Sequence, residues 1–246
     1  MNQDNVVRAS IDSIESFGLV DGPGIRVVVF FNGCKLRCKY CHNPEMWTKK
    51  DENYTPRELV NKIKRYKSYF KDRGGVTFSG GEPLLHSKFI IETAKLLKRE
   101  GIHIALDTAG VGLGDYAEVL KYIDLVLLDI KHITREGYKD ITGQEIDEVE
   151  KFIEEINNQN KPVWIRQVIV AGKTDSKEYI DGLVKYLERI NNIERVDFLP
   201  FHRLGQEKYK SLKIPYPYDY MTDMDKNRCD NLYIYFEQKF KRPINQ

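Results

Sequence analysis

The chain has 246 residues, which is enough for one large α/β domain with a substantial core or for two small domains. Its 39 Lys and Arg residues nearly balance its 37 Asp and Glu residues, so the net charge of +2 gives no general attraction to nucleic acid or to an anionic membrane. Apolar stretches are too short to span a bilayer, residues 1–5 are polar without a hydrophobic signal core, and no segment has the composition of a linker. These features predict one domain over residues 1–246, in the cytoplasm, with neither nucleic acid nor membrane as a partner.

Short runs of β-branched and apolar residues alternate along the chain with segments of helical periodicity. The first run, residues 9–16, is expected to add an antiparallel edge strand. The predicted parallel strands are residues 27–31, 76–79, 103–107, 125–129, 163–170 and 196–200. The predicted helices are residues 56–70, 87–100, 115–122, 147–159, 175–190 and 223–240.

Strict alternation of strand and helix predicts an α/β fold with a parallel sheet and right-handed crossovers. Periodicity does not separate a doubly wound sheet from a barrel. A complete eight-unit barrel takes about 200 to 250 residues or more, and six units are visible, so a closed barrel is disfavoured. In both architectures the working face lies at the carboxyl ends of the strands.

Three of the four cysteines, Cys34, Cys38 and Cys41, lie within eight residues, whereas Cys229 is far away in the sequence. Three thiolates from one loop can bind three irons of a cubane cluster and leave the fourth iron open to an outside ligand. An open iron indicates chemistry rather than a structural role. Cys229 falls inside a predicted helix and is expected to be a buried small hydrophobe.

Other interpretations of the cysteines remain. His42 follows Cys41 and could complete a zinc site, so the alternative from another functional class is a zinc-stabilised binding module that uses Cys34, Cys38, Cys41 and His42. A disulfide is less favoured, because so few cysteines without a signal peptide indicate a reducing compartment.

Polar residues follow the predicted strands at the points where the strands end. They are the turn Ser79-Gly80-Gly81-Glu82, then Asp107 and Thr108, then Asp129-Ile130-Lys131, with Arg166 on the fifth strand and His202 after the sixth. Two consecutive glycines let the backbone approach a ligand closely. In isolation, however, a Gly-Gly pair is a common turn, and strand-end aspartates are often caps or turn formers.

The spacing Cys-x3-Cys-x2-Cys, with Tyr40 before the last cysteine, resembles the signature of radical S-adenosylmethionine (SAM) enzymes. Residues 16–26 and 40–44 extend the resemblance to the activating enzymes of glycyl-radical enzymes. The resemblance implies a radical SAM core in the form of an open, partial (β/α)6 TIM-like barrel with a lateral gap that admits a large substrate. It also implies one 4Fe-4S cluster, held by Cys34, Cys38 and Cys41 on the cluster loop of residues 34–41.

The resemblance further implies a set of residues that bind SAM as cosubstrate. They are Tyr40, Cys41, His42, Asn43, Gly80, Gly81, Glu82, Asp107, Thr108, Asp129, Ile130, Lys131, Arg166 and His202. Asp107, Thr108 and Asp129 match positions that help to hold a monovalent cation, and Asp21 matches a position near the bound substrate peptide. The family usually has Asn where this chain has Ala109. No catalytic side chain is implied beyond the cluster and the cosubstrate.

The implied reaction is reductive cleavage of SAM to methionine and a 5'-deoxyadenosyl radical, which abstracts a Cα hydrogen from a glycine of a partner enzyme. The expected partners are a glycyl-radical enzyme and a flavodoxin-type reductant. Activators of other glycyl-radical enzymes commonly insert further cysteine clusters, which Cys229 alone cannot build, so pyruvate formate-lyase is favoured as the partner. Activation of a related glycyl-radical enzyme, such as 2-ketobutyrate formate-lyase, and radical chemistry on a small molecule are the alternatives within the enzyme class.

Overall fold

The computed structural model describes residues 6–242, so residues 1–5, where a signal core was expected to be absent, lie outside the described part of the chain. The strands form one sheet in which they lie side by side in chain order. They are β1 (Ile11–Gly18), β2 (Arg26–Phe31), β3 (Gly75–Gly80), β4 (His103–Thr108), β5 (Leu125–Ile130), β6 (Val163–Ile169) and β7 (Ile193–Pro200). Strand β1 pairs antiparallel with β2, and each later strand pairs parallel with its predecessor.

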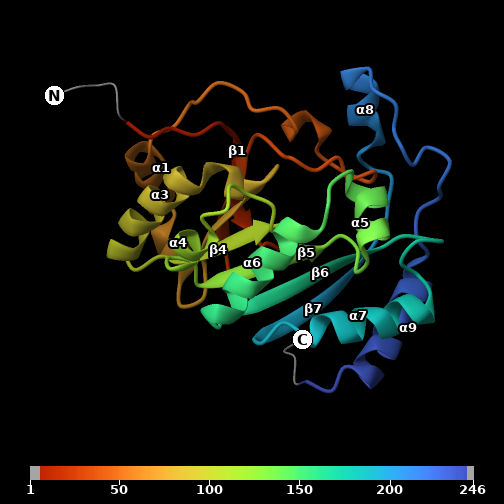
Figure 1. Ribbon diagram of the computed structural model, residues 1–246. Coiled ribbons are helices and arrows are strands. Elements are labelled where there is room, and N and C mark those ends of the chain that lie inside the picture. Colours follow the sequence, from red (N-terminus) through yellow and green to blue (C-terminus); the bar gives the residue numbers. More distant parts are fainter. Residues whose placement is uncertain (1–5, 243–246) are drawn as a thin grey trace.

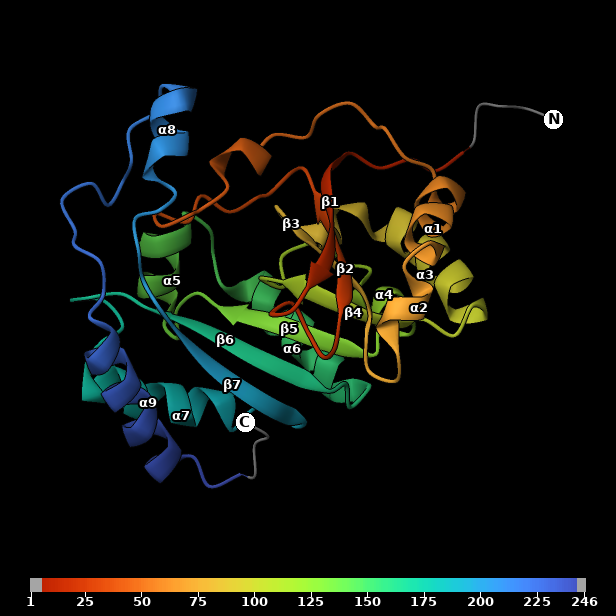
Figure 2. The same ribbon diagram turned by 180° about the vertical axis from the view of Figure 1, so that it is seen from behind.

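Strands β1 and β7 are the two edges of the sheet, so the sheet of the described residues does not close into a barrel. The predicted open α/β barrel and its antiparallel edge strand are therefore confirmed. Figure 1 shows helices in front of the sheet, and Figure 2 shows the other face, where β5, β6 and β7 lie in front of α6. Within residues 6–242, no helix is both long enough and apolar enough to cross a membrane.

The helices between the strands are α1 (Pro56–Lys64), α2 (Lys67–Phe70), α3 (Ser87–Arg99), α4 (Tyr116–Leu120), α5 (Arg135–Thr142), α6 (Asp147–Asn158) and α7 (Lys177–Leu187), and α8 (Gln206–Leu212) and α9 (Lys226–Lys239) follow the last strand. Two 3-10 turns, η2 (Pro44–Met46) and η3 (Pro83–His86), follow β2 and β3. The apolar stripes of these helices bury the covered face of the sheet. Cys229 lies in α9 and is 2% exposed, as expected of a small hydrophobe.

The predicted helix over residues 56–70 is wrong in its length. It begins at the expected capping box, where the Thr55 hydroxyl accepts from the Glu58 N–H and the Glu58 carboxylate accepts from the Thr55 N–H at 2.8 Å. It ends at Lys64, and α2 follows as a separate turn. Phe70 at the end of α2 is buried in the core, and a Cβ on Gly74 would lie only 2.2 Å from the Ile25 carbonyl oxygen.

Helices α5 and α8 lie where the sequence predicted no helix. Helix α5 has a Thr134 cap and ends at Gly143, whose φ of 74° is left-handed. Both helices are short, so their apolar residues repeat too few times to give a periodic signal. They matter because α5 packs behind the cluster loop and α8 packs beside it.

Candidate active site

A cavity of about 640 Å³ lies at the carboxyl ends of the strands. The sequence-predicted residues that line it are Asp21, Cys34, Cys38, Tyr40, Cys41, His42, Asn43, Gly80, Gly81, Asp107, Thr108, Asp129, Lys131, Arg166 and His202. Parallel strands bring their carboxyl ends to one edge, so residues far apart in the sequence meet here. Glu82 and Ile130 are absent from the lining.

The cluster loop is tied to the segment that follows it. The Gly33 N–H donates to the Met46 carbonyl at 2.7 Å, and the Cys34 N–H donates to the Trp47 carbonyl at 3.1 Å. Gly33 has a φ of 96°, which a residue with a side chain rarely adopts. The turn η2 therefore fixes where the first cysteine enters the cavity.

Helix α5 holds the other end of the loop. The unpaired carbonyls of its last turn accept two backbone hydrogen bonds, from Arg37 N–H to Thr142 at 2.8 Å and from Lys39 N–H to Ile141 at 3.0 Å. These bonds bracket Cys38. Helix α5, which the sequence patterns did not predict, thus supports the cluster loop.

The three thiols line the cavity together, with Cys38 buried and Cys34 and Cys41 half-buried. Burial raises the pKa of Cys34 to about 12 and of Cys38 to about 11, and it also raises the pKa of Cys41. Thiolates in this setting need a strong positive charge, which bound iron provides. Three soft sulfur donors on one cavity wall therefore fit an iron–sulfur cluster.

The zinc alternative finds no support in the geometry. Within residues 6–242, no three His, Cys, Asp or Glu side chains are grouped so as to hold a single metal ion. His42 is engaged elsewhere, since its Nε2 lies 3.2 Å from the His202 carbonyl oxygen and its ring stacks on the His202 ring at 4.2 Å. A 4Fe-4S cluster does not require three side chains grouped around one metal ion, because each thiolate binds a different iron.

The Gly80-Gly81 turn packs against the chain that leads into the cluster loop. The Gly81 N–H donates to the Phe31 carbonyl at 2.8 Å, and a Cβ on Gly81 would lie 2.4 Å from the Gly33 carbonyl oxygen. Gly80 has a φ of 113°. The protein's own packing therefore requires both glycines, in addition to any requirement from a ligand.

Glu82 does not line the cavity, and its side chain turns into the protein. It is 1% exposed, and its Oε1 accepts from the Thr108 hydroxyl at 2.6 Å while its Oε2 accepts from the Ala109 N–H at 3.0 Å. Burial raises the pKa of Glu82 to about 7. The carboxyl group thus holds the end of β4 in place, and Ile130, 2% exposed, likewise packs in the core. Both residues follow strands of the sheet, and the side chains of both point into the protein.

Four charged side chains form two ion pairs in the cavity wall. Arg166 Nη1 lies 3.2 Å from Asp107 Oδ1, and Lys131 Nζ lies 2.9 Å from Asp129 Oδ2. Burial, with a smaller contribution from Asp129, raises the pKa of Asp107 against the opposing effect of Arg166. For Lys131, burial disfavours the charged form, but the negative partners, Asp129 first, raise its pKa well above the usual value. The cavity therefore presents both signs of charge, which suits a zwitterionic ligand.

The β1–β2 connection brings Asp21 to the cavity. Arg166 Nη2 donates to the Val20 carbonyl at 2.7 Å, and the Thr77 hydroxyl donates to the Asp21 carbonyl at 2.6 Å. The fully buried Arg26 donates to the Pro23 carbonyl at 3.0 Å. The turn that carries Asp21 is thus fastened from three strands.

Several lining residues were not predicted. They are Phe30, Leu36, Trp47, Ser79, Ala109, Val168, Leu199, Pro200 and Phe201. Most are apolar residues of a kind found throughout the core, so no pattern distinguished them. Ser79 had a signal, its place directly before Gly80, and its hydroxyl donates to Asp107 Oδ2 at 2.7 Å.

Among the partners that residues 6–242 offer, two side chains of the lining find none for a buried polar atom. They are the Tyr40 hydroxyl and His202 Nδ1. A buried polar group without a hydrogen bond is costly, so these two atoms would gain from a polar ligand in the cavity. A cosubstrate with amino, carboxylate and nucleoside groups fits this requirement.

Comparison with known proteins agrees with this geometry. Residues 28–187 match the family model of the radical SAM superfamily. The chain is 50% identical over 235 residues to the pyruvate formate-lyase-activating enzyme of Clostridium pasteurianum, covering 95% of this chain and 99% of the relative. It is 39% identical over 249 residues to the enzyme of the same name from Staphylococcus epidermidis, covering 97% and 99%.

Solved structures support the fold. A domain of a pyruvate formate-lyase-activating enzyme from Bacteroides vulgatus superposes with a TM-score of 0.56 at 23% identity, over 70% of this chain and 98% of that one. A radical SAM methyltransferase from Sphaerobacter thermophilus gives a TM-score of 0.65 at 14% identity, over 96% and 76%. From the family match and the full-length relatives, the chain belongs to the radical SAM superfamily and, within it, to the family of pyruvate formate-lyase-activating enzymes.

Proposed function

We propose that this protein activates pyruvate formate-lyase by generating a glycyl radical on it. The observation that carries the proposal is the convergence of Cys34, Cys38 and Cys41 with charged strand-end residues on one cavity. The relative at 50% identity, which is named for this activity and matches over 95% of the chain, supports the choice of partner. Membership of the radical SAM superfamily implies a 4Fe-4S cluster and SAM.

In this proposal Cys34, Cys38 and Cys41 hold the cluster, and residues 1–246 form a single domain around it. When bound, the cluster supplies the electron that cleaves SAM to methionine and a 5'-deoxyadenosyl radical, which takes a Cα hydrogen from the partner's glycine. The protein binds and orients the cosubstrate and excludes water. The buried wall of the cavity and the two ion pairs serve these tasks.

Different cavity residues contact different parts of the cosubstrate. Gly80 and Gly81 present backbone groups to the methionine amine, while Lys131, Arg166 and His202 contact the carboxylate or the nucleoside. Tyr40, Cys41, His42 and Asn43 form the adenine side. Asp107, Thr108 and Asp129 hold a monovalent cation beside the carboxylate, a role that suits two clustered carboxylates. Glu82 and Ile130 act through packing, because Glu82 fixes Thr108 and Ala109.

The substrate is a glycine-containing loop of the partner, which enters beside Asp21. The unpaired edges β1 and β7 leave the barrel open, and a protein segment needs such an opening more than a metabolite does. The reductant is a flavodoxin-type carrier, the location is the cytoplasm, and the pathway is anaerobic glucose metabolism. A second cluster within the chain is not proposed, because Cys229 is buried in α9.

Electron paramagnetic resonance tests the proposal. The anaerobic protein, dithionite and SAM are mixed with pyruvate formate-lyase or with its variant in which alanine replaces the radical-site glycine. A glycyl radical signal is expected with the first and none with the second. Cleavage of SAM without a radical on pyruvate formate-lyase would contradict the proposal and favour a small-molecule substrate or a related glycyl-radical enzyme.

A further inference from the structure

The turn between β1 and β2 reaches from the amino ends of the parallel strands back to the cavity. Strand β2 begins at Arg26, so residues 19–25 lie at the end of β2 opposite to the cluster loop, which follows that strand. Asp21 nevertheless lines the cavity, and the Val20 carbonyl accepts from Arg166 Nη2 at 2.7 Å. The turn therefore folds back over the face of the sheet that bears the cavity, and its position has to be fixed from that face.

Arg26 is buried in contact with this turn. It is 0% exposed, and it lies on the same face of β2 as Phe30, which lines the cavity. Arg26 Nη1 donates to the Pro23 carbonyl at 3.0 Å. Gly22 packs directly on the Arg26 side chain, since a Cβ on Gly22 would lie 2.9 Å from Arg26 Cδ, and its φ of 125° favours glycine. The turn is thus built on the Arg26 side chain.

Arg26 also reaches Asp21 through Thr77. Arg26 Nε donates to Thr77 Oγ1 at 2.5 Å, and the Thr77 hydroxyl donates to the Asp21 carbonyl at 2.6 Å. A hydroxyl has a single hydrogen, so the Arg26 N–H that occupies one side of Oγ1 leaves this hydrogen to point at Asp21. Arg26 Nη2 donates to the Val76 carbonyl and lies 3.3 Å from His103 Nδ1. The guanidinium is therefore anchored on β3 and β4 and holds the turn both directly and through Thr77.

Stability alone is a poor explanation for a buried arginine at this place. Within residues 6–242 Arg26 forms no ion pair, and burial lowers its pKa to about 10 against the raising effect of the charges of Asp124 and Asp21. A buried cation without a paired carboxylate costs free energy that an apolar side chain would not. The Asp21 carboxylate, for its part, accepts no hydrogen bond from the described residues and is free for a ligand. These contacts indicate that Arg26 serves to hold Asp21.

We propose that Arg26 is a positioning residue for the protein substrate: it fixes the turn so that the Asp21 carboxylate faces the cavity and accepts hydrogen bonds from the partner's glycine loop. The inference rests on the proposed function, in which that loop enters beside Asp21. Hydrogen abstraction requires the glycine Cα to be held close to the radical, so a small displacement of Asp21 should weaken productive binding of the loop. Other residues bind SAM, and its affinity should not depend on Arg26.

Two substitutions interrupt these contacts at different points. Arg26→Met keeps a long side chain without its donors, and Thr77→Val keeps the shape of the side chain and removes the link to Asp21. With dithionite as reductant, we expect each variant to raise the KM for pyruvate formate-lyase in glycyl radical formation about tenfold. Iron content and the dissociation constant for SAM, measured by anaerobic calorimetry, should stay within twofold of the parent. Should Arg26→Met fail to fold, Thr77→Val decides the test.

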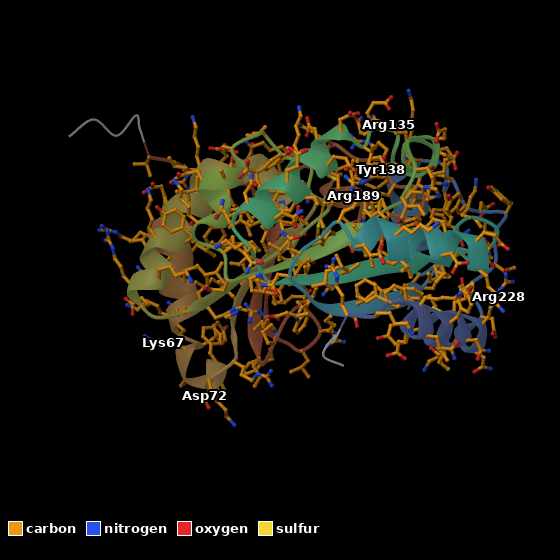
Figure 3. The ribbon with its side chains drawn as sticks, turned by 60° about the horizontal axis from the view of Figure 1, so that its bottom comes forward. Lys67, Asp72, Arg135, Tyr138, Arg189 and Arg228 are labelled. Carbon is orange, nitrogen blue, oxygen red and sulfur yellow. The ribbon has the colours of Figure 1, made fainter. Side chains whose placement is uncertain are left out.

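Each variant has a matched control. Arg189→Met makes the same replacement at an exposed arginine that pairs with Glu150 and is labelled in Figure 3. Thr93→Val alters another fully buried threonine, on α3, whose hydroxyl has no partner within residues 6–242. Neither control should change the KM for pyruvate formate-lyase by more than twofold.

A double-mutant cycle with Asp21 separates positioning from a general loss of structure. Asp21→Ala alone should also raise the KM about tenfold, and in that background Thr77→Val should change it by less than twofold, because the group that Thr77 positions is already gone. An unchanged KM in either folded variant, an equal rise with and without the Asp21 carboxylate, or a parallel loss of SAM affinity would overturn the proposal. Failure of the proposed function would appear separately, as SAM cleavage by the unaltered protein without a glycyl radical on pyruvate formate-lyase.

Discussion

Arg166 on β6 and Asp107 on β4 form an ion pair across the intervening strand β5, with Nη1 3.2 Å from Oδ1. Both side chains are largely buried, at 15% and 14% exposed. Such a pair adds little net stability, but removing one partner leaves the other as an uncompensated buried charge. The pair therefore helps to set the shape and charge of the cavity.

We expect Arg166→Gln to lower the free energy of unfolding by about 3 kcal/mol and to weaken SAM binding, because Asp107 and the Val20 carbonyl both lose their partner. Denaturant unfolding and anaerobic calorimetry measure the two effects. Arg195→Gln is the control, since its pair with Asp197 is more exposed and should be worth about 1 kcal/mol or less. Equal losses in the two variants would show that burial does not set the energetics of the Arg166 pair.

The iron ligands can be separated from the remaining cysteine. Replacement of Cys34, Cys38 or Cys41 by alanine should abolish the brown iron–sulfur absorbance and the bound iron, because each supplies a thiolate at the cavity. Cys229→Ala should keep its iron, since that side chain is buried in α9. Iron analysis after anaerobic reconstitution decides the matter, and the assignment fails if Cys229→Ala loses the cluster while a loop variant retains it.

A side chain at Gly81 should affect the cluster loop as well as the cosubstrate. The Cβ of Gly81→Ala would lie 2.4 Å from the Gly33 carbonyl oxygen and 2.9 Å from the Met46 carbonyl oxygen. Both carbonyls belong to the backbone that positions Cys34, so we expect lower iron content together with weaker SAM binding. The control is Gly172→Ala, where no atom lies within 4 Å of the new Cβ, although the φ of 69° adds strain there too. Normal iron content in Gly81→Ala would mean that the turn acts on the ligand alone.

The buried carboxyl group of Glu82 should give a pH-dependent stability. Its pKa is raised by burial to about 7, so the folded state retains a proton that the unfolded chain releases near pH 4.5. Stability contributed by this proton is complete at low pH, and the free energy of unfolding should fall by about 3 kcal/mol as the pH rises from about 4.5 to about 7.

Glu82→Gln removes this titration. The amide nitrogen of the new glutamine would face the Ala109 N–H in place of an acceptor. This change lowers the free energy of unfolding by a constant amount of about 1 to 3 kcal/mol at every pH. The free energy of unfolding of the parent minus that of the variant should therefore fall by about 3 kcal/mol across that pH window, so the parent's advantage disappears or reverses. Chemical denaturation at pH 5, 6, 7 and 8 measures the gap, with exposed Glu207→Gln as the control. Parallel curves of unfolding free energy against pH for the parent and Glu82→Gln would show that the pKa of Glu82 is not raised in the folded state.

Much of the architecture could be predicted from local sequence. Apolar runs identified each strand, and helical periodicity identified the longer helices. Burial of one or both faces of an element imposes these repeats on neighbouring residues. The polar residues after those runs could be assigned to one edge, since parallel strands end together. The cysteine spacing predicted a shared site for Cys34, Cys38 and Cys41 because three ligands on one loop cannot lie far apart.

Tertiary structure decided how these residues are held and where they point. The carbonyls of Ile141 and Thr142 support the cluster loop, and Lys208 reaches Asn43 from 165 residues away, contacts that no local pattern records. Glu82 follows a strand as predicted but turns toward Thr108, because the direction of a side chain after a strand depends on how the next turn packs. Sequence determines which residues reach an edge of the sheet, since that follows from local hydrogen bonding and burial. The contacts they make there arise only when distant segments pack together.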